Sequence, residues 1–191
     1  MERAVFLDRD GVINKIGYND DIGLCTPHTE REVEFFPNVV EAVKKINELG
    51  FKTILVGNQP DVSKGRLSEE MHRRIHKKII NTLASGKAHL DGAYYCFHKQ
   101  EDGCSCRKPK PGMLLQAAKD FNIDLKKSFM IGDTFADIGA GKAVGCKTVL
   151  LGSHRCDLCR FMEEYNINPD FIVRSLYDAV NLIEKNYNEE A

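Results

Sequence analysis

The chain has 191 residues, of which 42% are hydrophobic, and this size and composition predict one globular domain spanning 1–191 with a buried core. Its 27 basic and 28 acidic side chains give a net charge of −1, which excludes an overall attraction to nucleic acid or to an anionic membrane. The charged N-terminus argues against a signal peptide, no apolar run has membrane-spanning length, and the seven cysteines are more typical of reduced thiols than of a disulfide framework. We therefore expect a cytoplasmic protein with no nucleic-acid or membrane partner, and we favour a monomer.

Short β-branched or aromatic runs alternate with segments of helical spacing along the chain. Strict alternation of the two predicts a Rossmann-like three-layer α/β/α sandwich with a mainly parallel sheet. The segment 15–35 has no regular pattern and is expected to form a short flap. The predicted elements, in chain order, are a strand at 4–8, a helix between Pro37 and Gly50, a strand at 52–57, a helix at 68–85, a strand at 93–97, a helix after Pro111, a strand at 128–133, a helix at 135–145, strands at 147–152 and 170–173, and a helix at 175–186.

Acidic and amide side chains stand where the predicted strands end. Asp8 and Asp10 follow the first strand, Asn58 follows the second, and Asp133 ends the strand at 128–133. Ligands of open parallel sheets bind at these carboxyl ends, and crowded carboxylates must either take up protons or hold a cation such as Mg²⁺. Each acid alone could equally be a helix cap or a turn residue. Their joint placement predicts one shared metal site.

Three segments resemble motifs of the haloacid dehalogenase superfamily. FLDRDGVIN (6–14) is similar to its first motif, CRKPKPGM (106–113) to the segment with its third-motif lysine, and MIGDTFADIGAG (130–141) to its fourth motif. Within the superfamily, DRDG and a cysteine-rich loop before Arg-Lys-Pro most resemble the heptose bisphosphate phosphatases and the related histidinol phosphatases. The resemblance implies a phosphatase that removes the 7-phosphate of D-glycero-D-manno-heptose 1,7-bisphosphate, or alternatively one that acts on histidinol phosphate.

The same resemblance implies a role for each acidic residue of the motifs. Asp8 would be the nucleophile that forms an aspartyl phosphate, which divides one difficult displacement into two easier ones. Asp10 would act as the general acid and base. Mg²⁺ would be bound by the Asp8 carboxylate, the Asp10 backbone carbonyl and Asp133, with Asp137 supporting these ligands from behind.

Three further residues are expected to bind phosphate or substrate, namely Asn58, Arg107 and Lys108. Lys108 offers a compact positive charge for the phosphoryl oxygens, and Arg107 offers a planar fork for a hydroxyl or a second phosphate. The chain departs from the family at Gly57, where a Thr or Ser hydroxyl is usual, and at Thr134, where the bisphosphatases often have lysine. Because the lost hydroxyl would weaken transition-state stabilisation, a phosphate-binding protein with weak or lost turnover stays an alternative.

The loop ahead of these residues has the spacing C-x-H-x5-C-x-C, formed by Cys96, His98, Cys104 and Cys106. Three thiolates and one imidazole make the closed tetrahedral set that structural Zn²⁺ prefers, and four protein ligands leave no position for a catalytic water. The bland alternative is a reduced cysteine cluster with an incidental histidine. The ion is expected to fix the loop that aims Arg107 and Lys108 at the site.

Other features favour structural interpretations. We interpret the pair Cys156 and Cys159 as an ordinary helix start rather than a redox or metal pair, the basic stretch 72–78 as a solvated helix face, and His28 as a loop residue. The short spacing between the motifs leaves no room for a large cap domain. We therefore expect an open site, closed only by the flap and the cysteine-rich loop.

Overall fold

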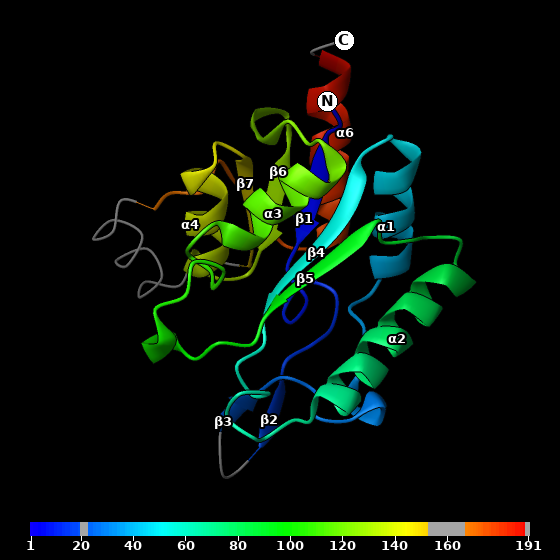
Figure 1. The fold of residues 1–191 in the computed structure, drawn as a ribbon. Coiled ribbons are helices and arrows are strands. Elements are labelled where there is room, and N and C mark those ends of the chain that lie inside the picture. Colours follow the sequence, from blue (N-terminus) through cyan, green and yellow to red (C-terminus); the bar gives the residue numbers. More distant parts are fainter. Residues whose placement is uncertain (20–22, 153–166, 190–191) are drawn as a thin grey trace.

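A computed structural model describes residues 1–19, 23–152 and 167–189, which form an α/β fold in three layers (Figure 1). The central sheet has six strands in the order β5-β4-β1-β6-β7-β8, and every neighbouring pair is parallel. The predicted sandwich with a mainly parallel sheet is therefore confirmed. The strands are β1 (Ala4–Leu7), β4 (Lys52–Asn58), β5 (Gly92–Cys96), β6 (Phe129–Gly132), β7 (Lys147–Leu151) and β8 (Phe171–Val173).

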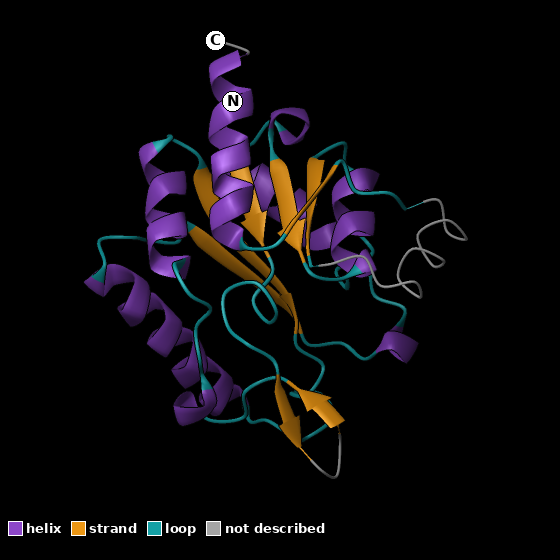
Figure 2. Ribbon diagram, turned by 180° about the vertical axis from the view of Figure 1, so that it is seen from behind, coloured by secondary structure: helices purple, strands orange, loops and turns teal. Residues whose placement is uncertain are grey.

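Helices cover both faces of the sheet, as Figures 1 and 2 show from opposite sides. Side chains of a strand point alternately to its two faces. Val5 and Leu7 of β1 join the core formed with α1 (Val39–Glu48), α2 (Glu69–Ser85) and α6 (Leu176–Glu189). Ala4 and Phe6 join the core formed with α3 (Gly112–Phe121) and α4 (Phe135–Ala143). Because both faces are buried, the strands carry the unbroken apolar runs from which they were predicted.

The segment 15–35 is more ordered than its sequence indicated. It forms an antiparallel hairpin of β2 (Gly17–Asn19) and β3 (Gly23–Cys25), followed by the short helix η1 (Glu30–Glu32). Each hairpin strand has only three residues and begins with glycine, so neither strand produces a readable alternation of apolar and polar side chains. The prediction of an irregular flap was therefore wrong in its secondary structure.

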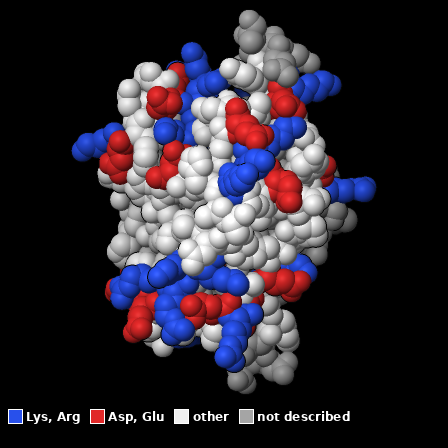
Figure 3. All heavy atoms as spheres, turned by 90° about the vertical axis from the view of Figure 1, so that its right-hand side faces the viewer, with Lys and Arg blue, Asp and Glu red and all other residues white. Residues whose placement is uncertain are grey.

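The basic stretch 72–78 lies on α2, and most of it is the exposed face that was predicted. Arg73 and Arg74 pair with Glu69 and Glu30, and Figure 3 shows positive and negative side chains mixed on this side of the molecule. His72 contradicts the prediction because only 4% of its surface is exposed. A histidine one helical turn before Ile75 and two turns before Ile79 lies on the same face as these buried residues, and this places it in the core.

The central strand β1 marks the point where the chain changes direction across the sheet. The chain continues from β1 to β4 on one side, and β6 pairs with β1 on the other side. Ligand sites of such folds lie outside the carboxyl ends of the strands at this point. The hairpin and the loop with η2 (Gln100–Asp102) lie at that end, and both termini lie at the opposite end (Figure 1).

Two further expectations concern membrane-spanning helices and the pair Cys156 and Cys159. No helix among the described residues is long and apolar enough to cross a membrane. The pair Cys156 and Cys159, interpreted as a helix start, lies outside the described residues.

Candidate active site

Lys108 is the centre of the charged cluster at the carboxyl ends of β1, β4 and β6. Its Nζ atom lies 2.8 Å from Asp8 Oδ1 and 2.5 Å from Asp137 Oδ1, and it also donates to the Val56 carbonyl at 2.8 Å. Only 3% of the residue is exposed. Burial alone would lower the pKa of Lys108, but the charges of Asp137 and Asp8 outweigh burial and raise that pKa above its ordinary value. The lysine is therefore a fixed positive charge in contact with Asp8.

Asp133 completes a group of three acids around the same point. Oxygens of Asp8, Asp133 and Asp137 all lie within 4.8 Å of one another, and Asp133 Oδ1 is buried without a hydrogen-bond partner. Burial raises the pKa of Asp8 to about 7, and burial followed by the charge of Asp137 raises the pKa of Asp133 to about 7. Crowded carboxylates with one unpartnered buried oxygen have the donor set that a hard divalent cation requires.

Gly11 allows this crowding. It has a φ of +87°, and a Cβ atom at this position would lie 2.1 Å from Asp133 Oδ2. A side chain at residue 11 would therefore occupy the space of the Asp133 carboxylate. The sequence DRDG needs its glycine for two reasons. The turn after β1 requires a positive φ at this position, and a side chain here would displace the Asp133 carboxylate.

Asp10 lies beside this group and is held by five hydrogen bonds. Its carboxylate accepts from Arg9 Nε at 3.1 Å and Nη2 at 2.9 Å, from Asn14 at 2.8 Å, from Gln59 at 2.7 Å and from the Thr26 hydroxyl at 3.0 Å. Burial would raise the pKa of Asp10, but the charge and hydrogen bonds of Arg9 and the amide donors outweigh burial and lower it. Asp10 is therefore fixed in orientation and stabilised as a carboxylate.

The residues that hold Asp10 were not identified from the sequence. Arg9 and Asn14 lie inside the first motif, where an excess of polar residues beside a buried strand was an available signal. Gln59 directly follows Asn58 and carried the same signal. Thr26 lies 16 residues from Asp10 within the segment that lacks a readable pattern, so no signal in one sequence pointed to it.

Two predicted substrate-binding residues have protein partners. The side-chain amide of Asn58 donates to the Lys108 carbonyl at 3.0 Å and accepts from the Lys108 N–H at 3.1 Å. Arg107 donates to the His98 carbonyl at 3.2 Å. The structure thus brings Asn58 to the expected edge of the sheet, where it holds the Lys108 backbone.

A cavity of about 500 Å³ opens beside Lys108, between the loop that precedes α3 and the start of α4. Lys99, Arg107 and Lys110 contribute to its lining from the loop, and Phe135 and Ala136 contribute from α4. No acidic side chain is among the described residues that line it. The cavity therefore favours an anionic group beside Lys108.

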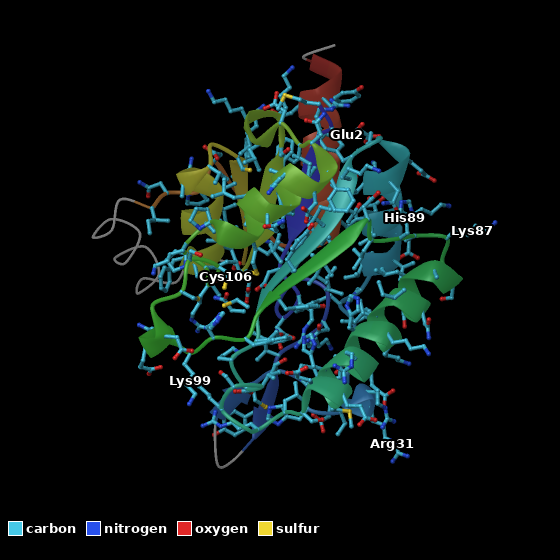
Figure 4. All side chains as sticks on the ribbon, viewed as in Figure 1. Glu2, Arg31, Lys87, His89, Lys99 and Cys106 are labelled. Carbon is cyan, nitrogen blue, oxygen red and sulfur yellow. The ribbon has the colours of Figure 1, made fainter. Side chains whose placement is uncertain are left out.

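The four predicted zinc ligands lie together, Cys96 at the end of β5 and the other three on the loop that follows, where Figure 4 labels Lys99 and Cys106. Cys106 Sγ lies 3.2 Å from Cys96 Sγ, 3.4 Å from Cys104 Sγ and 3.3 Å from His98 Nδ1. Sulfur atoms bound to one tetrahedral Zn²⁺ at about 2.3 Å would lie about 3.8 Å apart, which is close to these spacings. Burial raises the pKa of Cys96 to about 12, so a cation is needed to hold this sulfur as a thiolate.

The sheet and the acid cluster at its edge define a hydrolase of the haloacid dehalogenase type. The HAD-hydrolase-like family matches residues 105–179. The chain is 35% identical over 192 residues to the D-glycero-beta-D-manno-heptose-1,7-bisphosphate 7-phosphatase of Pasteurella multocida, with 96% of this chain and 98% of the relative covered. It is 39% identical to the enzyme of the same name from Vibrio cholerae, with 78% and 80% covered.

Solved structures support the same fold. A D,D-heptose 1,7-bisphosphate phosphatase from B. bronchiseptica, complexed with magnesium and phosphate, superposes with a TM-score of 0.82 at 24% identity and covers 99% of both chains. The chain belongs to the family of these heptose bisphosphate phosphatases, and it is a phosphatase. The alternative of a phosphate-binding protein without turnover is not favoured by these relatives.

Proposed function

We propose that the chain is a Mg²⁺-dependent phosphatase that removes the 7-phosphate of D-glycero-β-D-manno-heptose 1,7-bisphosphate. The names of its relatives indicate this substrate. The observation that carries the proposal is the cavity beside Lys108, because Lys99, Arg107 and Lys110 line it and no acidic side chain is among the described residues of the lining. A substrate with two phosphates fits such a lining, since one phosphate can reach Asp8 while the other meets these cations.

Histidinol phosphate is the second candidate, and the same lining disfavours it. This compound has one phosphate, and its other end carries an amine that is protonated at neutral pH. Placing that amine among Lys99, Arg107 and Lys110 would bring like charges together, which costs binding free energy.

The reaction would proceed in two steps at Asp8. Asp10 is a carboxylate in the free site, so it must carry a proton once the anionic substrate is bound. In the first step an Asp8 oxygen attacks phosphorus, the bond between phosphorus and the sugar oxygen breaks, and the leaving alkoxide takes this proton from Asp10. In the second step Asp10 takes a proton from water, the resulting hydroxide attacks the phosphorus of the aspartyl phosphate, and the bond between phosphorus and the Asp8 oxygen breaks, which frees inorganic phosphate and the Asp8 carboxylate. Lys108, 2.8 Å from Asp8, would offset charge on the phosphoryl oxygens in both steps.

We propose that Asp8, Asp133 and the Asp10 backbone carbonyl hold Mg²⁺. The bound ion supplies positive charge that offsets the repulsion between the carboxylates and the phosphate. Asp137 has other partners, because Oδ1 receives Lys108 and Oδ2 accepts from the Thr134 N–H at 3.1 Å and hydroxyl at 2.6 Å. We therefore assign Asp137 to holding Lys108 in place.

We also propose that Cys96, His98, Cys104 and Cys106 bind a structural Zn²⁺. The ion would stabilise the loop that carries Lys99 and Arg107, and it would leave no position for a catalytic water. A site built from reduced thiolates is typical of a reducing compartment, which supports the expected cytoplasmic location.

A substrate panel tests the proposed function. Purified protein is assayed for phosphate release from heptose 1,7-bisphosphate, histidinol phosphate and p-nitrophenyl phosphate, with Mg²⁺ and with EDTA. The heptose bisphosphate should show the highest kcat/KM, and EDTA should abolish turnover of all three. A higher kcat/KM for histidinol phosphate would refute the proposed substrate, and turnover that is unchanged by EDTA would refute the proposed Mg²⁺ dependence.

A further inference from the structure

The segment that follows the hairpin is bound to the catalytic loops at two points. The Thr26 hydroxyl donates to Asp10 Oδ2 at 3.0 Å and accepts from the guanidinium of Arg9. Two residues later, His28 Nε2 lies 2.9 Å from Asp61 Oδ2 on the loop after β4. The exit of the hairpin is therefore fixed against both the turn after β1 and the loop after β4.

We propose that Thr26 is a positioning residue that orients the Asp10 side chain for proton transfer to the leaving group. This inference rests on the general acid role proposed for Asp10. Thr26 touches the same carboxylate oxygen, Oδ2, that receives Arg9 Nη2 and Gln59, so it helps to fix which way the carboxyl group faces.

Thr26 differs from the other partners of Asp10 in its origin. Arg9 and Asn14 belong to the loop that carries Asp10, and Gln59 follows β4 directly, so the sheet fixes all three. Thr26 comes from the hairpin side and lies 16 residues away in sequence. Through this hydroxyl, the placement of the hairpin contributes to the orientation of Asp10.

The Thr26 hydroxyl also bridges a buried ion pair. It accepts from Arg9 and donates to Asp10 at the same time, and its distance of 3.5 Å to Gln59 Oε1 places it inside a closed polar network. Arg9 is fully buried, and its Nη1 atom already has no partner. Removing the hydroxyl would leave the carboxylate with its bonds to Arg9, Asn14 and Gln59, and it would loosen the orientation of Asp10 by removing the restraint that comes from the hairpin side.

If Thr26 orients Asp10 for proton transfer, its replacement should lower the rate by a factor that depends on the leaving group. A sugar alkoxide needs a proton as the bond to phosphorus breaks, whereas p-nitrophenolate is stable enough to leave without one. A misplaced Asp10 should therefore slow the first step, which kcat/KM reports, much more for the alkyl ester than for the aryl ester. A merely structural role for Thr26 would slow both reactions equally.

The test compares Thr26→Val, which keeps the shape, with Thr26→Ser, which keeps the hydroxyl. Each enzyme, loaded with Mg²⁺ and Zn²⁺, is assayed for kcat/KM on heptose 1,7-bisphosphate and on p-nitrophenyl phosphate, because kcat/KM reports the transfer of the phosphoryl group to Asp8 and excludes the second step, which both esters share. If wild type does not hydrolyse the former, the alkyl ester that it hydrolyses best replaces it. Thr26→Val should lower kcat/KM on the alkyl ester by about 10–100-fold and on the aryl ester by less than about threefold, and Thr26→Ser should stay within about threefold of wild type on both.

Controls separate this inference from the proposed function. Asp10→Asn should show the same dependence on the leaving group, and if it does not, the proposed role of Asp10 fails. Thr29→Val, in the same segment but bonded to Glu32, should leave the ratio of the two rates unchanged. If Thr26→Val does not fold, Thr26→Ala is measured instead. An equal loss on both esters in Thr26→Val, no loss on either, or failure of Thr26→Ser to restore the ratio would overturn the inference.

Discussion

The ammonium group of Lys108 lies 2.8 Å from Asp8 Oδ1, so the proposed nucleophile rests directly against a buried cation. A carboxylate attacks phosphorus only in its ionised form, and burial opposes ionisation by raising the pKa of Asp8 to about 7. Lys108 acts in the opposite direction, because its charge favours the carboxylate. The pair therefore affects two quantities, the free energy of unfolding and the fraction of Asp8 that is ionised for attack.

Replacing Lys108 with methionine should lower both stability and activity. The change leaves Asp8 and Asp137 without their buried counter-ion, and breaking a buried pair in this way typically costs about 3–5 kcal/mol of unfolding free energy. The loss should be smaller at pH 5 than at pH 7.5, because the raised pKa of Asp8 lets this acid be neutralised by protonation at pH 5. Urea unfolding at both pH values measures the effect, and an equal loss at both would contradict this account.

Asp8→Asn should abolish turnover and leave the fold intact. Without the carboxylate no aspartyl phosphate can form, so phosphate release should fall by at least about a thousandfold. Because burial disfavours the ionised Asp8, the neutral amide should not lower the thermal midpoint of metal-free protein. Phosphate release and thermal melts test both parts, with Asp120→Asn on α3 as a matched control. Residual trapping of acid-stable phosphoprotein in Asp8→Asn would point to another nucleophile.

The sheet and most helices were predictable from the sequence, because the apolar runs and the cap residues of each segment match its burial and its bounds in the fold. Residues Ala4–Leu7 are all fully buried, as an unbroken apolar run between two helical layers should be. Ser68 accepts from the Met71 N–H and starts α2 where the cap signal placed it. The hairpin was missed because each of its strands has only three residues, too few for a readable alternation of apolar and polar side chains. The contact of Thr26 with Asp10, directly after the hairpin, joins residues 16 positions apart and leaves no local pattern.

The part of the candidate site that lies at the carboxyl ends of the strands was predictable from the sequence. Asp8, Lys108 and Asp133 meet as expected, because parallel strands bring their carboxyl ends to one edge. No pattern around Asn58 predicts that its side-chain amide forms two hydrogen bonds with the Lys108 backbone. The direction of a side chain depends on the partners that folding brings near, and a single sequence does not contain that information.

Zinc removal should weaken binding of the bisphosphate more than binding of a small aryl phosphate. The loop between Cys96 and Cys106 carries Lys99, which lines the cavity at a distance from Asp8. Cys106→Ser should lower the zinc content below one ion per chain, lower the thermal midpoint, and raise KM for the bisphosphate by about tenfold or more. Cys25→Ser is the matched control, because Cys25 lies on β3 outside the set. Equal changes of KM for both esters would exclude this role of the loop.

The pH dependence of stability should contain a contribution from His72. Burial, followed by the charge of Arg9, lowers the pKa of His72 from 6.5 to about 4. The unfolded chain takes up a proton at His72 near pH 6.5, whereas the folded chain does so only near pH 4. The free energy of unfolding is therefore unaffected by this group above pH 6.5, and it decreases as the pH falls from 6.5 toward 4. His72→Phe keeps a ring against Tyr95 and Phe97 and removes the titration. Urea unfolding between pH 4.5 and 7.5 should show a shallower slope in this variant, and an unchanged slope would refute the assignment.

Substitutions at Gly57 should separate a packing effect from a missing hydroxyl. A Cβ at this position would lie 3.2 Å from Tyr95 Cδ1 on the neighbouring strand, which is tighter than ordinary contact. Tyr95 has little freedom to move, because its hydroxyl lies 2.8 Å from His76 Nδ1 and its ring contacts His72 edge-on. Gly57→Ala and Gly57→Ser should therefore both lower the unfolding free energy by about 1–3 kcal/mol.

The two variants should differ in rate, because only serine supplies the hydroxyl that the family resemblance leads us to expect at this point. If that donor stabilises the transferred phosphoryl group, kcat of Gly57→Ser should exceed kcat of Gly57→Ala by about tenfold or more. Comparing the variants with each other cancels the shared crowding against Tyr95. Equal kcat values would mean that another donor already fills the place of the hydroxyl, and that glycine is present here because Tyr95 packs over the strand end.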